Sequence, residues 1–316
     1  MARILTITLN PALDLTVQMA RLEPGQVNRS EGLLSHAAGK GLNVAQVLAD
    51  LGHQLVVAGF LGQDNPQPFE ALIRQRGFVD GFIRVPGETR SNIKLAEADG
   101  RITDINGPGP WVDDAAQQAL LDSLEQLAGG CAVAVVAGSL PQGIRPEWLQ
   151  TLLLRLKGLG LKVALDTSGA ALRAGLVAGP WLVKPNDEEL ADVYGQPVES
   201  LAARRAAANW LQGQGVEHVV ISRGAAGVNW FGPNAAWQAV PPKVAVLSTV
   251  GAGDSLLAGM LHGLLSGHTP ELTLGRATAI AAMAVTQIGF GVADPLQLAE
   301  LARGVQVRAL TEEQEG

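Results

Sequence analysis

Cysteine is almost absent from this chain of 316 residues, in which Cys131 is the only one. A single cysteine excludes an internal disulfide and a cysteine-rich zinc site, and the apolar residues around Cys131 indicate a core thiol. No apolar run reaches the ~18 residues of a membrane span. The N-terminus also lacks the long apolar region of a signal peptide. We therefore expect a protein of the reducing cytoplasm with no membrane partner.

Positively charged residues are also few. The chain has 23 Lys and Arg residues against 30 Asp and Glu residues, which gives a net charge of −7. Nucleic-acid binders usually carry a basic face, so this balance argues against nucleic acid as a partner. Hydrophobic residues make up 47% of the chain, which is enough for a large core and argues against disorder.

Three common catalytic patterns are missing. No Gly-x-x-x-x-Gly-Lys-Ser/Thr segment is present, which excludes a P-loop, and no Gly-x-Gly-x-x-Gly follows an expected strand, which weakens a dinucleotide-binding interpretation. The five histidines show no His-Glu-x-x-His spacing, so the familiar pattern of zinc proteases is absent as well.

Short apolar strands alternate with helical periods over most of the chain. Helices are expected at 40–51, 66–76, 113–128, 146–157, 187–194, 200–212, 252–266 and 272–287, and strands at 1–9, 54–60, 132–137, 162–166, 181–184 and 218–222, with a β-rich passage to 246. The segment 132–137 is continuously apolar, as expected for a strand covered on both faces. We predict an α/β fold, with a mostly parallel sheet between two layers of helices.

Two strand-like segments with polar alternation, residues 12–36 and 88–106, break this pattern. Asp99-Gly100 marks a hairpin turn in the second segment. Both adjoin sequence that is expected at the ligand-binding edge of the sheet. We predict that residues 1–316 form a single domain, into which these segments are inserted as a small β-sheet that covers the site as a lid.

The strongest local signal is Val250-Gly251-Ala252-Gly253-Asp254, directly before an apolar helix. The glycines let backbone N–H groups turn toward a ligand, and the helix N-terminus adds positive potential, so the segment can cradle an anion. An aspartate in such a cradle can accept a hydroxyl proton while the amides stabilise a phosphoryl group. The alternative interpretation is an ordinary helix start, where the helix dipole favours an Asp.

A second glycine turn, Gly39-Lys40-Gly41, opens the helix that carries Asn43 one turn further on. Ammonium, amide and backbone N–H groups at one end of a helix suit a polyol phosphate. Taken alone, the segment is explained more simply as a capped surface helix with a solvated lysine.

The two segments, in this order and about 210 residues apart, resemble the two signatures of the PfkB, or ribokinase-like, carbohydrate kinase family. The resemblance covers nearly the whole chain, from Thr8-Leu9-Asn10-Pro11-Ala12-Leu13-Asp14 to the last core helix. It implies a three-layer α/β/α sandwich that uses ATP and Mg²⁺ to phosphorylate a sugar hydroxyl. By the same analogy we expect a homodimer formed through the β lid.

The resemblance also implies roles for individual residues. Asp254 is expected to be the general base, and the backbone of Gly251, Ala252 and Gly253 the anion hole. The expected substrate contacts are Asp14, which would hold sugar hydroxyls, and Gly39, Lys40 and Asn43.

On the nucleotide side, Lys184-Pro185-Asn186-Asp187-Glu188-Glu189 resembles the Asn-x-x-Glu motif of the family. This implies that Asn186 and Glu189 lie near Mg²⁺ and the nucleotide phosphates; without the resemblance the stretch would be only the acidic first turn of a helix. The other expected nucleotide contacts are Lys184, Ser222, Gly224, Gly227, Thr249, Gly251 and Gly253.

The segments Asn10-Pro11-Ala12-Leu13-Asp14 and Thr89-Arg90-Ser91-Asn92-Ile93-Lys94 resemble the branch of the family that acts on sugars already carrying a phosphate. A phosphate dianion prefers Arg and Lys partners. The expected phosphate contacts are Lys40, Arg90 and Lys94, with Arg29 and Ser139 as possible helpers.

The resemblance to this branch implies that the substrate is a phosphorylated ketohexose, with fructose 1-phosphate ahead of tagatose 6-phosphate and fructose 6-phosphate. A kinase for a nucleoside or an unphosphorylated sugar is disfavoured by the basic lid residues. A non-catalytic sugar-phosphate-binding regulator is a more distant alternative, against which the intact Asp254 argues.

Two positions depart from the family pattern. Ala38 stands where a further glycine is usual, which would tighten the turn slightly. Arg223 stands where a leucine is common, and it either reaches the nucleotide phosphates or points to solvent.

Overall fold

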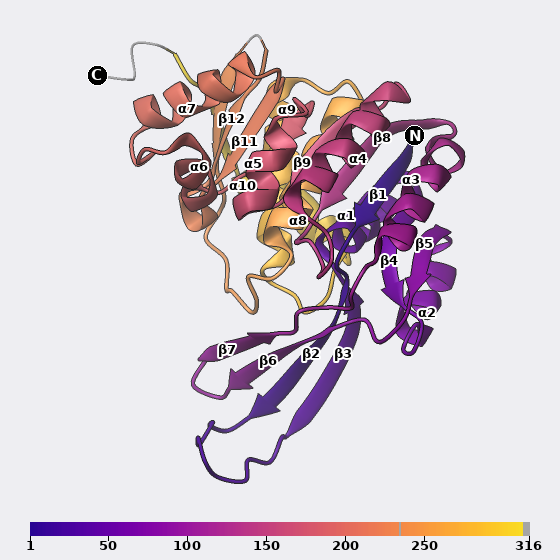
Figure 1. Cartoon of the computed structure of the whole chain (residues 1–316). Coiled ribbons are helices and arrows are strands. Elements are labelled where there is room, and N and C mark those ends of the chain that lie inside the picture. Colours follow the sequence, from indigo (N-terminus) through magenta and orange to yellow (C-terminus); the bar gives the residue numbers. More distant parts are fainter. Residues whose placement is uncertain (234, 312–316) are drawn as a thin grey trace.

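The computed structural model describes residues 1–233 and 235–311 (Figure 1). Within these ranges the largest element is a ten-stranded sheet of order β14-β13-β12-β11-β10-β9-β8-β1-β4-β5. Neighbouring strands from β5 to β11 run parallel, and those from β11 to β14 antiparallel. The strands are β1 (Arg3–Thr8), β4 (Gln54–Gly62), β5 (Val79–Val85), β8 (Cys131–Ala137), β9 (Lys162–Asp166), β10 (Leu182–Val183), β11 (His218–Ser222), β12 (Val228–Phe231), β13 (Ala236–Val240) and β14 (Gln306–Ala309).

Helices cover both faces of this sheet. On one face lie α3 (Asp114–Ala128), α4 (Pro146–Gly158), α5 (Gly169–Leu176), α6 (Asp187–Tyr194) and α7 (Leu201–Gly213). On the other lie α1 (Lys40–Asp50), α2 (Gln67–Arg76), α8 (Ala252–Leu265), α9 (Pro270–Ala284) and α10 (Pro295–Gly304).

The central strands are apolar because both of their faces are buried. In β8, for example, Ala134 and Val136 pack on the α3–α7 side, while Val133 and Val135 pack on the α1 and α8 side. The predicted fold class, a three-layer α/β/α arrangement with a mostly parallel sheet, is therefore confirmed. Over the residues that the structure covers, no helix has both the length and the apolarity that a membrane crossing requires.

A small separate sheet of order β3-β2-β6-β7 projects from the main body at the bottom of Figure 1. Its strands are β2 (Ala12–Met19), β3 (Gly32–Ala38), β6 (Ser91–Glu97) and β7 (Ile102–Asn106). They come from the two segments that break the alternation of the sequence. Two statements about this sheet and the chain stay predictions: the sheet acts as a lid, and the whole chain forms one domain.

The parallel strands bring distant parts of the chain to one edge of the large sheet. β1, β9, β10 and β11 end there, and β9 and β11 end at Asp166 and Ser222. The first turns of α1 and α8 lie at the same edge, because Asn43 of α1 hydrogen-bonds to Asp254 of α8. In open parallel sheets this edge is the usual ligand site.

Candidate active site

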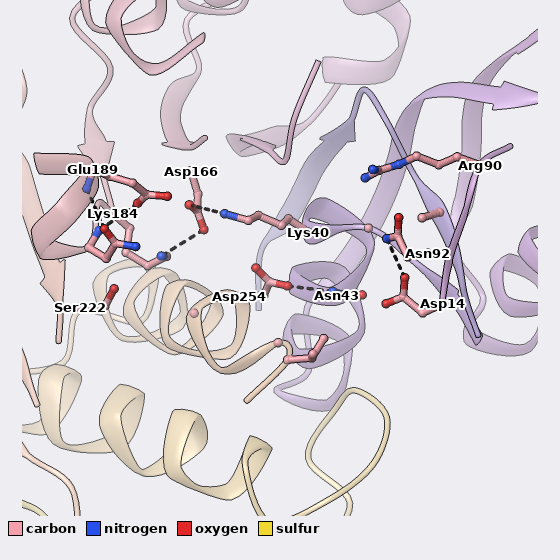
Figure 2. Close-up of a pocket in the computed structure, with 16 residues that line it drawn as sticks. Asp14, Lys40, Asn43, Arg90, Asn92, Asp166, Lys184, Glu189, Ser222 and Asp254 are labelled. Atoms are coloured by element: carbon pink, nitrogen blue, oxygen red, sulfur yellow. Dashed lines mark hydrogen bonds and ion pairs between the residues drawn. The ribbon is translucent and has the colours of Figure 1, made fainter. Parts of the chain in front are cut away.

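A cavity of about 360 Å³ opens at this edge, beside the small sheet (Figure 2). Most of the site residues predicted from the sequence line it: Asp14, Gly39, Lys40, Asn43, Arg90, Lys184, Asn186, Glu189, Ser222, Gly251, Gly253 and Asp254. Those that do not line it are Ala252, Lys94, Ser139, Gly224, Gly227 and Thr249.

Asp254 lies in the first turn of α8 with its side chain only 5% exposed. Asn43 donates a hydrogen bond of 2.8 Å from Nδ2 to Oδ2 of Asp254, which fixes the carboxylate at the cavity wall. The preceding Gly251 has φ +79°, and a Cβ there would lie 2.7 Å from Cε1 of Phe290, so both its backbone and its surroundings require glycine.

Burial raises the pKa of Asp254 to about 6, and the negative charge of Asp166 adds to this increase. Lys40, Asn43 and Lys184 act in the opposite direction. A carboxylate with this pKa is mostly ionised at neutral pH, yet it is more basic than an exposed aspartate. It can therefore accept a proton from a hydroxyl group.

Asp166 is a site residue that the sequence analysis missed. It ends β9 and is 1% exposed, and its Oδ1 and Oδ2 lie 3.1 Å and 3.2 Å from Nζ of Lys40 and Lys184. Burial opposes its ionisation, but the two ammonium groups outweigh burial and lower the pKa of Asp166. The signal available in the sequence was its place at the carboxyl end of an expected parallel strand.

Asp14 of β2 and Asn92 of β6 form the part of the cavity wall that the small sheet contributes. Asn92 Nδ2 donates to Oδ1 of Asp14 at 3.0 Å. Burial raises the pKa of Asp14, with Asn92, Lys94 and Arg90 acting in the opposite direction. The carboxylate of Asp14 at this wall can accept hydrogen bonds from the hydroxyl groups of a sugar.

Arg90 lies at the cavity wall, but its guanidinium is used largely within the protein. It donates hydrogen bonds to the carbonyl oxygens of Asn10, Pro11 and Gly107, at 3.1, 3.4 and 3.1 Å. Arg90 therefore ties the turn after β1 to the chain that follows β7. Ser139 lies close by and accepts a hydrogen bond of 3.2 Å from Asn10 Nδ2.

Lys94 lies in an adjoining cavity of about 460 Å³, which shares Asp14 and Asn92 with the first. Its Nζ is 3.8 Å from Oδ1 of Asp104, a half-exposed carboxylate, so this ion pair is long. His36 lines the same cavity. The cavity that contains Lys94 therefore adjoins the first cavity at the wall that carries Asp14.

Asn186 and Glu189 make a reciprocal cap at the start of α6. Glu189 N donates to Asn186 Oδ1 at 2.7 Å, and Asn186 N donates to Glu189 Oε2 at 2.9 Å. Both residues also line the cavity. The helix-start interpretation of this stretch is thus correct, and the same two side chains are available to a ligand.

The other predicted nucleotide contacts lie around this end of the cavity. Ser222 lines it and pairs with Asn186 in an isolated β-bridge. Gly224 and Gly227 border the short helical turn that follows Ser222, and Thr249 is exposed in the segment before α8.

The two departures from the family pattern have structural explanations. Arg223 neither reaches the cavity nor lies free in solvent, because its Nε is 3.3 Å from Oδ2 of Asp187. Ala38 ends β3 opposite Ala12, where it is buried and needs no glycine conformation.

With this geometry in place, comparison with known proteins identifies the class. Residues 7–296 match the model of the pfkB family of carbohydrate kinases, and the chain belongs to this family. It is 47% identical over 308 residues to the 1-phosphofructokinase of Vibrio cholerae, covering 98% of this chain and 97% of that protein. It is 45% identical over 307 residues to the 1-phosphofructokinase of Escherichia coli K12, covering 97% and 98%.

Solved structures agree. The phosphofructokinase-2 of Escherichia coli in complex with potassium superposes with a TM-score of 0.89 at 27% identity, covering 96% of this chain and 99% of that one. Another structure of that enzyme, its tetrameric inhibited form, superposes with a TM-score of 0.87 at 26% identity over the same shares of the two chains. The predicted family membership is confirmed.

Proposed function

We propose that this chain is an ATP-dependent 1-phosphofructokinase. It transfers the γ-phosphoryl group of ATP to the 6-hydroxyl of fructose 1-phosphate, and the products are fructose 1,6-bisphosphate and ADP. Relatives that cover nearly the whole chain at 45–47% identity carry this name. The observation that carries the proposal is the buried Asp254, held by Asn43 at the start of α8 in a cavity that also contains Lys40 and Lys184.

Asp254 acts as the general base. Its carboxylate takes the proton of the 6-hydroxyl as that oxygen attacks the γ-phosphorus, and the bond from this phosphorus to the β–γ bridging oxygen breaks. Asn43 keeps the carboxylate oriented toward the cavity. A pKa of about 6 leaves Asp254 ionised at neutral pH before the substrate arrives.

The start of α8 and the two lysines stabilise the transferred group. The N–H groups at Gly251 and Gly253 stand at a helix N-terminus, where the backbone dipoles favour negative charge. Lys40 and Lys184, whose ammonium groups flank Asp166, also line the cavity and bring two positive charges to it. Such preorganised charges stabilise a phosphoryl group in transfer.

Magnesium fits the nucleotide end of the cavity. The amide and carboxylate oxygens of Asn186 and Glu189 are hard ligands of the kind that Mg²⁺ prefers, and both residues line the cavity. In the part of the chain that the structure describes, no cluster of three or more His, Cys, Asp or Glu side chains could hold a metal alone. This agrees with an ion that keeps phosphate and water ligands. Bound magnesium would neutralise charge between the β- and γ-phosphates.

The sugar lies between Asp254 and the small sheet in this proposal. Asp14 accepts hydrogen bonds from its hydroxyl groups, and the 1-phosphate extends toward the adjoining cavity and Lys94. Arg90 is tied to three backbone carbonyls, so it contributes mainly by shaping this wall. Lys94, in a long ion pair with a half-exposed partner, has more freedom to bind a phosphate.

We also propose that the chain forms a homodimer through the small sheet and works in the cytoplasm. The small sheet carries exposed apolar side chains, among them Leu33 and Ile105. Exposed apolar side chains gathered on one sheet favour a protein–protein contact.

A comparison of acceptors tests the proposed substrate. The value of kcat/KM is measured with ATP and Mg²⁺ for fructose 1-phosphate, tagatose 6-phosphate and fructose 6-phosphate. Fructose 1-phosphate should give the highest value. A higher value for either of the other sugars would contradict the substrate assignment. Absence of turnover with all three would favour the non-catalytic regulator.

A further inference from the structure

Asp166 is a charged residue of the cavity to which no function has yet been given. Its carboxylate is 1% exposed, although it lies at the edge of the sheet where a solvated loop usually begins. It occupies the end of β9, between β8 and β10 in the middle of the parallel sheet. A buried charge is costly to retain unless it is paired, so its partners indicate what it is for.

Those partners are two lysines from different parts of the fold. Lys40 opens α1, 126 residues before Asp166, and Lys184 follows β10. The carboxylate uses one oxygen for each ammonium group, at 3.1 Å and 3.2 Å. Figure 2 shows the two lysine side chains meeting Asp166 from two sides, with Asp254 beside them.

We infer that Asp166 is a positioning residue for phosphoryl transfer, because its carboxylate holds the ammonium groups of Lys40 and Lys184 together at the cavity and sets the charge felt by Asp254. This inference rests on the proposed kinase function. A lysine side chain has four rotatable carbons and many rotamers, so an ammonium group keeps one place only where a partner fixes it. Two unneutralised ammonium groups side by side would also repel each other.

The surroundings leave little freedom for the lysines. Lys184 is 5% exposed, and a Cβ on Gly253 would lie 3.2 Å from its Nζ, so the ammonium group is close to the backbone at the start of α8. Lys40 is less enclosed, with 40% of its side chain exposed. Asp166 is thus what keeps the more exposed of the two ammonium groups at the cavity.

The same carboxylate acts on the proposed base. The groups that act on the ionisation of Asp254 are Asp166 from β9, Lys40 and Asn43 from α1, and Lys184 after β10. The negative charge of Asp166 raises the pKa of Asp254, and the two lysines lower it. Removing the charge of Asp166 takes away the first effect and leaves the lysines without their neutralising partner. Both changes lower the pKa of Asp254.

The first test is Asp166→Asn, which keeps the shape of the side chain and removes its charge. The pH dependence of kcat/KM, measured with ATP and the best phosphorylated ketohexose, reports the free enzyme. Its acid limb follows the ionisation of Asp254, so it should move to lower pH by about one unit. Misplaced lysines should lower kcat by about 100-fold. A variant that folds and keeps both the acid limb and kcat of the wild type would overturn the inference.

Asp166→Glu separates position from charge. It keeps the negative charge but moves the carboxylate by one methylene group, so the acid limb should stay in place while kcat falls by about tenfold or more. If Asp166→Asn does not fold, this variant decides. A wild-type kcat in Asp166→Glu would overturn the inference, and a lowered kcat with an unchanged acid limb would support it.

The matched control is Asp50→Asn. Asp50 also forms an ion pair, 2.6 Å from Nη1 of Arg76, at the far end of α1. Its loss should leave both the acid limb and kcat unchanged. The wild-type enzyme separates the two claims. If the wild type transfers phosphate to none of the ketohexose phosphates, the proposed function fails. If the wild type is active and Asp166→Asn keeps both its acid limb and its kcat, only the role of Asp166 is removed.

Discussion

Replacing Asn43 with leucine tests how the pKa of Asp254 is set. Asn43 Nδ2 donates a 2.8 Å hydrogen bond to Asp254 Oδ2, and this bond favours the ionised carboxylate. A hydrogen bond to a charged group contributes ~1.5–3 kcal/mol, and one pKa unit corresponds to ~1.4 kcal/mol. Leucine has a similar size and donates no hydrogen bond. The pKa of Asp254 should therefore rise by about one unit or more.

The consequence for activity follows from the direction of this shift. The base must be ionised, so the acid limb of kcat/KM moves upward from about 6. With a pKa one unit higher, the ionised fraction at pH 7 falls from ~90% to ~50%, a loss of about twofold from titration alone. Above about pH 9 this part of the loss disappears, and what remains measures misorientation of the carboxylate.

The assay is the pH profile of kcat/KM for phosphorylation of fructose 1-phosphate. The matched control is Gln117→Leu, because Gln117 is also a buried amide and donates to the carbonyl oxygens of Val112 and Gly143, away from the cavity. This control should lose stability and keep the acid limb of the wild type. A folded Asn43→Leu enzyme whose acid limb does not move, or moves to lower pH, would refute the reasoning.

The remaining predictions concern the phosphate contact, the dimer and the stability of the site. Lys94→Met should raise KM for fructose 1-phosphate about tenfold or more, as expected for losing a charged hydrogen bond, and leave KM for ATP unchanged; equal changes in both would exclude the phosphate role. Ile105→Glu should halve the mass found by sedimentation, whereas Val177→Glu, at a position that is also exposed but directly follows α5 and is not in the small sheet, should not; an unchanged mass in Ile105→Glu would contradict the proposed interface. Asp254→Asn should raise the free energy of unfolding at pH 8 by on the order of 1–3 kcal/mol, because the raised pKa means that ionised Asp254 costs stability above about pH 6. Below pH ~3.8 the carboxyl is protonated in both folded and unfolded chains, so that gain should vanish, and a gain independent of pH would contradict the assigned pKa.

Much of the layered fold could be predicted because burial on both faces makes the central strands continuously apolar. β8 and β9 are of this kind, and their ends were placed within a residue. The edge elements escaped prediction. β5 has only two buried residues, and the short α5 has eight residues, so neither shows a long periodic pattern. β14 pairs with β13, which lies about 70 residues earlier in the chain, and a pairing over this distance produces no pattern in the local sequence.

The candidate site was predictable where a motif carried it and not elsewhere. Asp254 and Asn43 lie in recognisable glycine segments, and they meet in the structure. Asp166 is a single aspartate at a strand end with no motif around it, and its role depends on two lysines brought close only by the fold. Arg90 and Lys94 were equivalent as basic residues of one segment. Only the hydrogen bonds of Arg90 to backbone carbonyls distinguish them.

The turnover of Asp254→Asn tests the central claim most directly. The variant should bind ATP like the wild type, because the asparagine keeps the size of the side chain and can still accept the hydrogen bond from Asn43. Formation of fructose 1,6-bisphosphate from saturating ATP and fructose 1-phosphate should fall by about 10²- to 10⁴-fold, the range expected for losing a general base. Near-normal turnover in this variant would contradict the account.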